Sequence, residues 1–151
     1  MAQGDITVFN QFIEDMGTKV HDLNADTVKL GLVTSTVTPT AATTDGRWGA
    51  GGSTNFSTNE VTPGGNYTTG GADVVNTYSQ TSGTGTFDAS DTAMDITSHA
   101  SNPTNVRWGI FYNDTSAGKE AIAFLDFGAD TDLTAGDLDI TVNASGLFTI
   151  A

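Results

Sequence analysis

Apolar and polar residues alternate most clearly between positions 106 and 127, and this segment predicts two paired strands. The alternating apolar positions of the first strand are Val106, Trp108, Ile110 and Tyr112. Such a period of two indicates a strand with one strongly buried face. Residues 113–119 supply Asn, Asp and Gly for a turn, and residues 121–127 are apolar on most of both faces, except at Asp126. A hairpin this apolar is expected at the centre of a β-sandwich or barrel, with Trp108 in the core.

Helical spacing of apolar residues occurs near the start of the chain. The stripe consists of Phe9, Phe12, Ile13 and Met16. The pattern predicts an N-terminal helix over 6–17, capped by Asp5 or Thr7 and ending at Gly17. A helix this short does not persist alone in water, so its stripe must be covered. Packing on the core is favoured over a role at an interface between subunits, for which Phe9 and Phe12 are the candidates.

The rest of the chain predicts further short strands separated by turns. With the hairpin, the expected strands are 28–33, 59–62, 72–80, 93–97, 106–112, 121–127, 138–142 and 146–150. About eight short strands at this spacing are typical of an antiparallel β-sandwich or a jelly-roll-like fold. No internal repeat or domain boundary is visible, so residues 1–151 are expected to form a single domain.

Residues 34–58 predict a long loop between the first strands. Loops beyond roughly 12–15 residues are usually functional or disordered. Trp48 and Phe56 within this loop indicate that it lies against another surface. Both are therefore candidates for an interface.

Charge and composition restrict the function. The 18 acidic residues outnumber the five basic ones and give a net charge of −13, which disfavours direct binding of nucleic acid or of an anionic membrane. Plain solvation of the surface is favoured over docking on a basic partner. There is no cysteine, which excludes disulfides and thiolate sites. Neither a secretory signal nor an apolar run of membrane-spanning length is seen, so synthesis in a cytoplasm is expected.

Residues that could carry chemistry are few. His21 and His99 lie in no recognisable catalytic motif, and Ser, Thr and Asp are so abundant that some must lie near any histidine. Catalysis is disfavoured, and no cofactor is expected. A weak calcium candidate is the acidic set Asp130, Asp132, Asp137 and Asp139. Its spacing matches neither an EF-hand nor a repeat-type calcium motif, so a solvated acidic loop is favoured.

Four segments together resemble a family of small virion proteins of tailed bacteriophages. They are VHDLNADTVKLGLVT, YTTGGADV, VRWGIFYNDTSAGKEAIAFLDFG and VNASGLFTI, in this order. The residues at the family's motif positions are His21, Asp22, Leu23, Asp26, Lys29, Leu30, Tyr67, Gly70, Gly71, Arg107, Tyr112, Asn113, Asp114 and Asp126. The match spans nearly the whole chain, and its motifs are structural rather than catalytic.

The resemblance implies a non-enzymatic structural protein of the virion. It is compatible with a capsid decoration (cement) protein that is made in the host bacterial cytoplasm. Such a protein would bind the major capsid protein on the outer surface of the head and stabilise it. A homo-oligomer, with a trimer favoured, would turn weak contacts into avidity. The alternative is a tail or fibre component that binds a receptor or carbohydrate through exposed aromatics such as Trp48, Phe56 and Tyr67. An enzyme is the third class.

Overall fold

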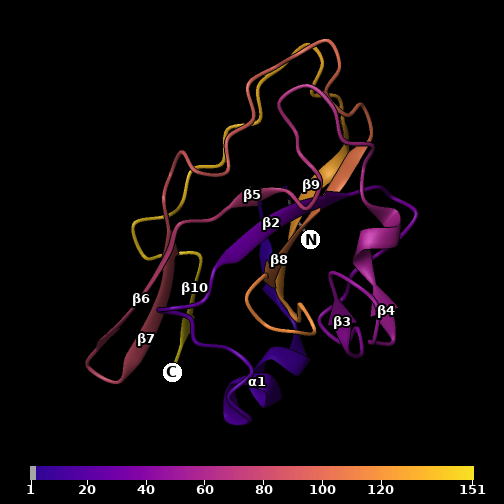
Figure 1. Ribbon diagram of the computed structural model, residues 1–151. Coiled ribbons are helices and arrows are strands. Elements are labelled where there is room, and N and C mark those ends of the chain that lie inside the picture. Colours follow the sequence, from indigo (N-terminus) through magenta and orange to yellow (C-terminus); the bar gives the residue numbers. More distant parts are fainter. Residues whose placement is uncertain (1–2) are drawn as a thin grey trace.

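The computed structural model describes residues 3–151 and is built on a five-stranded antiparallel sheet (Figure 1). Its strands, in spatial order, are β1 (Ile6–Val8), β9 (Ala121–Thr131), β8 (Val106–Asn113), β2 (Val28–Val33) and β5 (Ala72–Asp73). The predicted central hairpin is confirmed as β8 and β9, and β8 pairs on its other side with β2.

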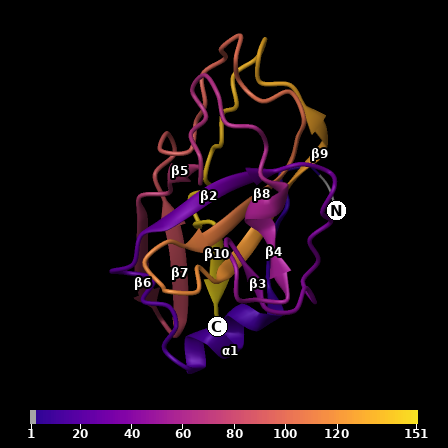
Figure 2. The same ribbon diagram turned by 45° about the vertical axis from the view of Figure 1, so that its right-hand side comes forward.

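Two smaller layers cover the two faces of this sheet (Figure 2). On one face lies a three-stranded antiparallel sheet of β10 (Phe148–Ile150), β7 (Thr84–Ala89) and β6 (Asn76–Thr81). On the other face lies the excursion after β2, with the parallel pair β3 (Gly46–Arg47) and β4 (Thr54–Asn55) and the 3₁₀ helix η1 (Phe56–Asn59). The fold is therefore all-β, with mostly antiparallel sheets and, among residues 3–151, one short α-helix.

Both faces of the central hairpin are buried because each has its own core. Phe111 and Leu125 contribute to the core under the three-stranded sheet, while Trp108 and Phe124 contribute to the core under the excursion. Strands covered on both faces carry nearly continuous apolar sequence. This arrangement explains the apolar character of residues 121–127.

The predicted helix over 6–17 is shorter than expected. Residues 6–8 form strand β1 along the edge of β9, and α1 is confined to Asn10–Gly17. Phe9 is the N-cap and makes no side-chain cap hydrogen bond, so the prediction that Asp5 or Thr7 caps the helix is wrong. Ile6 and Val8 are spaced two residues apart, which favours an edge strand over the apolar stripe of a helix. Packing on the core is confirmed for Phe9 and Phe12, each 2% exposed.

Several predicted strands are reduced to single bridges. Neither 93–97 nor 138–142 is a strand, and only Ile96 and Leu138 pair there. The N–H groups of Ile140 and Val142 instead donate to the carboxylates of Asp95 and Asp91. Likewise, 59–62 retains only a bridge from Glu60 to Val33, and 72–80 is divided at Val75, whose φ is +51°.

Candidate functional site

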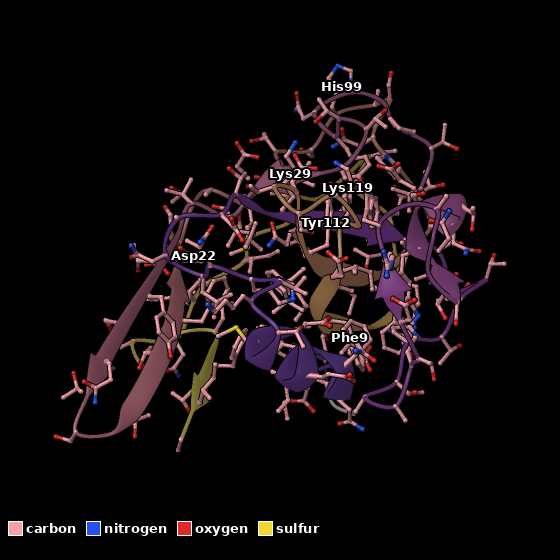
Figure 3. All side chains as sticks on the ribbon, turned by 60° about the horizontal axis from the view of Figure 1, so that its bottom comes forward. Phe9, Asp22, Lys29, His99, Tyr112 and Lys119 are labelled. Carbon is pink, nitrogen blue, oxygen red and sulfur yellow. The ribbon has the colours of Figure 1, made fainter. Side chains whose placement is uncertain are left out.

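A polar cleft opens beside the turn between β8 and β9. We call it the polar cleft; its lining residues are Lys29, Trp48, Ser57, Glu60, Thr69, Gly70, Tyr112, Asp114 and Lys119, and its volume is about 470 Å³. The register of β2 against β8 brings two of these residues together, because Lys29 on β2 lies opposite Tyr112 on β8. Figure 3 shows Lys29, Tyr112 and Lys119 close together.

Cations gather around the polar cleft although the chain has only five. The Lys29 Nζ lies 3.4 Å from Asp114 Oδ2, and Lys119 pairs with the same carboxylate. Burial opposes ionisation of Asp114, but the two ammonium groups outweigh it and lower the pKa of that carboxyl. Beside the cleft, Arg47 lies 3.4 Å from Glu120 Oε1. Each of these cations is therefore already engaged with a carboxylate of the chain itself.

Tyrosine hydroxyls tie the loop after β4 to the central sheet. The Tyr67 hydroxyl donates to Glu60 Oε1 at 2.8 Å and accepts the N–H of Leu32 at 3.0 Å. The Tyr112 hydroxyl donates to the Gly70 carbonyl at 2.7 Å. Burial raises the pKa of both tyrosines well above the ordinary value, so both remain hydrogen-bond donors at neutral pH.

An aromatic stack closes the floor of the polar cleft. The rings of Trp48 and Tyr112 are parallel within 6° and their centroids are 4.9 Å apart. Trp48 lies directly over Gly31 of β2, where any side chain would overlap the indole. Gly31 thus makes room for the residue that attaches the excursion to the sheet.

A buried polar network lies at the other end of the same turn. Asn113 is fully buried; its Nδ2 donates to Asp26 Oδ2 at 2.6 Å and lies 3.1 Å from His21 Nδ1. His21 Nε2 and Asp15 Oδ2 are 3.8 Å apart, and neither has a hydrogen-bond partner among the described residues. Burial lowers the pKa of His21 and outweighs the opposing effect of Asp15, Glu120 and Asp26. At neutral pH the imidazole is therefore uncharged, and it contacts α1 through the ring of Phe12, with the two ring centroids 5.3 Å apart.

The two histidines, for which a catalytic role was disfavoured, do not lie together in the structure. His99 is exposed at the edge of the molecule, where its Nδ1 accepts the N–H of Ser101 at 3.1 Å (Figure 3). His21 is enclosed by the buried network. Since Lys29 and Lys119 pair with Asp114, and Glu60 accepts from the Tyr67 hydroxyl and the Gly70 N–H, the arrangement is suited to fixing loops in place.

The weak calcium candidates are not brought together. Asp130 accepts from the Ser35 hydroxyl, Asp132 from Thr134, and Asp137 from the N–H of Ser98. Hydrogen bonds lower the pKa of both Asp132 and Asp137. Asp139 instead lines a separate hollow beside β1. Within residues 3–151, no group of three or more potential metal-ligating side chains is found.

The four interface candidates are buried within the chain. Phe9 and Phe12 are 2% exposed, Trp48 is 6% exposed and Phe56 is fully buried. The prediction that these side chains are exposed for contact with a partner is therefore wrong. They belong to the two cores that cover the faces of the central sheet. Tyr67 is also buried, which removes the exposed aromatics expected for carbohydrate binding.

Some residues of the site were not found from the sequence. These residues come from weakly patterned segments, and only the fold brings Glu60 into the lining of the polar cleft and the pair Arg47 and Glu120 beside it. Asp126 was expected to be the exception to burial, yet it is 3% exposed. Its carboxylate pairs with Arg107, whose guanidinium lies 3.8 Å from the centroid of the Trp108 ring. The available signal was a cation, Arg107, directly beside the apolar anchor Trp108 in the sequence.

Comparisons with protein-family models, with curated proteins and with solved structures find no match for this chain. Over residues 3–151, no helix has the length and apolar character needed to cross a bilayer.

Proposed function

We propose that the chain is a non-enzymatic structural protein of a tailed-bacteriophage virion. The favoured role is a capsid decoration (cement) protein that binds the major capsid protein on the outside of the head and stabilises the shell. It would act as a homo-oligomer, with a trimer favoured, after synthesis in the host bacterial cytoplasm.

One observation supports this proposal above the others: the motif residues of the resemblance contact one another. Asn113 binds Asp26, Lys29 pairs with Asp114, and the Tyr112 hydroxyl binds the Gly70 carbonyl. Gly71 lies against the Leu30 carbonyl, and Arg107 pairs with Asp126. These five contacts are the pairs 26–113, 29–114, 70–112, 30–71 and 107–126.

This use of the motif residues favours a structural role. Residues kept for catalysis are oriented toward a space that a substrate can occupy. Here the motif residues instead fix the segments 21–27, 67–71 and 113–119 to the central sheet. The product is a rigid β-domain with an acidic exterior, which suits a protein added to the surface of a preformed shell.

High-resolution imaging of purified virions tests the proposal. Density that fits this chain at repeated positions on the outer face of the head would support a decoration protein. Density on the tail, or none on the particle, would contradict it. Adding purified chain to heads that lack it, followed by heating, gives a second readout, because a cement protein should raise the temperature at which the heads release DNA.

The alternative, a receptor- or carbohydrate-binding component of the tail or fibre, depends on the polar cleft alone. Its mixture of Ser57, Thr69 and charged groups around the Trp48 edge offers hydrogen bonds to a sugar. A glycan array separates the two proposals. Specific glycan binding that is lost in Thr69→Val would favour the tail component.

A further inference from the structure

A second hollow, distinct from the polar cleft, lies between α1 and the three-stranded sheet. We call it the apolar groove; its lining residues are Val8, Phe12, Ile13, Met16, Tyr78, Phe148, Thr149, Ile150 and Ala151, and its volume is about 450 Å³. Most of these residues belong to α1, β6 and β10, which lie near one another in Figure 1.

The groove exists because the smaller sheet is only partly covered. Phe148 lies opposite Phe87 in the register of β10 and β7, and the Phe12 ring contacts Phe148 edge-on at 5.6 Å. Ile150, one strand step further, is only half-buried. At the rim of the groove, Ile13 is 72% exposed. Among the described residues only Ile13 and Val75 are large apolar side chains with this degree of exposure.

The groove also lacks charge on a strongly acidic molecule. None of its lining residues is Asp, Glu, Lys or Arg. They come from residues 8–16, from Tyr78 and from residues 148–151, and the two charged residues within these stretches, Glu14 and Asp15, do not line the groove. The rest of the chain therefore carries the whole net charge of −13.

This charge distribution selects the occupant. Two copies of a chain with net charge −13 repel each other wherever their acidic surfaces meet. They can approach most closely through the uncharged face, where burial of Ile13, Met16 and Ile150 supplies the attraction. A basic partner would gain no electrostatic attraction in the groove, because the acidic side chains that could pair with its charges lie elsewhere on the chain.

We propose that the apolar groove is the surface through which copies of this chain associate. The exposed Ile13 of one copy enters the groove of the next, against the residues of β10. The proposal deepens the proposed function by naming its self-association surface, and it concerns the purified chain without any particle.

Mass measurements in solution test this surface. Sedimentation or light scattering of the full chain is expected to give a multiple of the 15.6 kDa protomer at tens of micromolar, with dissociation on dilution. Ile13→Glu should weaken the association at least tenfold while leaving the circular dichroism spectrum and the melting temperature nearly unchanged. Val75→Glu is the matched control, since it adds the same charge at a residue that is 63% exposed and outside the groove.

Salt provides an independent readout. Association through an uncharged face of an acidic chain should tighten severalfold between 20 and 300 mM NaCl, because screening removes the repulsion. A wild-type mass of one protomer at all concentrations, association unaffected by Ile13→Glu, equal losses in the two variants, or weakening by salt would each overturn the proposal. Imaging of virions decides the proposed function separately, because a chain that associates in solution can still be absent from the head.

Discussion

At the scale of the residue, glycines and buried polar groups explain why the motif positions hold these residues. Gly71 has a φ of +81°, and a Cβ at this position would overlap the Leu30 carbonyl of β2. Only glycine allows both the left-handed backbone and the close approach to the strand. The two glycines of the motif YTTGG therefore serve the attachment of the loop to the sheet.

Gly71→Ala should destabilise the protein by roughly 2–3 kcal/mol, from backbone strain and steric overlap together. Urea unfolding followed by tryptophan fluorescence measures the change. Gly49→Ala is the control, because Gly49 has no positive φ and its added Cβ would meet no atom within 4 Å. Equal effects of the two substitutions would show that the contact with Leu30 does not matter.

His21 predicts a dependence of stability on pH. Burial lowers the pKa of His21 in the folded protein below its ordinary value of 6.5, so the unfolded chain binds more protons as the pH falls past that value. The free energy of unfolding should therefore fall between pH 7.5 and pH 5.5. The lowered pKa values of Asp114 and Asp126 add a further loss only at more acidic pH.

Variants of the two histidines isolate this effect. In His21→Gln the decline between pH 7.5 and pH 5.5 should become smaller, whereas His99→Gln, at an exposed position, should retain the full decline. Urea titrations at both pH values supply the comparison. A full decline in His21→Gln would place the responsible group elsewhere.

At the scale of the element, sequence periodicity identified the strands that lie within the sheet. β2, β8 and the first part of β9 follow from strong alternation or continuous apolar runs, because their neighbours are other strands. Segment 138–142 shows the same pattern but is no strand, since side chains of Asp91 and Asp95 bind its N–H groups. No local pattern reveals that carboxylates 45 or more positions away replace a neighbouring strand.

The candidate site was predictable to a similar extent. The resemblance marked Lys29, Tyr112 and Asp114, and period-two spacing placed Tyr112 on a buried strand. Their pairing depends on the register of β2 against β8, which hydrophobic alternation alone does not fix. The excursion 34–58 was correctly expected to lie against another surface, but that surface is the chain's own sheet rather than a partner.

This placement reverses one expectation for the excursion. Phe56 was expected at an interface, but it is fully buried against Phe9 and the central sheet. Phe56→Ala should therefore cost about 3–5 kcal/mol of unfolding free energy, as truncation of a core aromatic does. Ser53→Ala, at an exposed position three residues earlier, is the control for the same segment. Chemical denaturation that shows a near-wild-type midpoint for Phe56→Ala would contradict the two-core arrangement.

At the scale of the whole molecule, charge balance has a consequence for stability. Four of the five cations, Lys29, Arg47, Arg107 and Lys119, are held in ion pairs within the chain. The remaining acidic groups repel one another across the surface. Repulsion between exposed charges that are far apart is screened by salt more strongly than contact between partly buried pairs. Salt should therefore stabilise this protein, although it weakens each ion pair.

Raising NaCl from 10 to 200 mM should increase the free energy of unfolding on the order of 1 kcal/mol, which corresponds to about 2–4 °C in the melting temperature. Differential scanning calorimetry at neutral pH, in a dilute buffer that adds little ionic strength of its own, measures the shift. Glu14→Gln, which removes one exposed acid from α1, should raise the melting temperature at 10 mM NaCl and reduce the response to salt. A melting temperature that falls with salt would mean that the ion pairs around the polar cleft contribute more to stability than the surface repulsion removes.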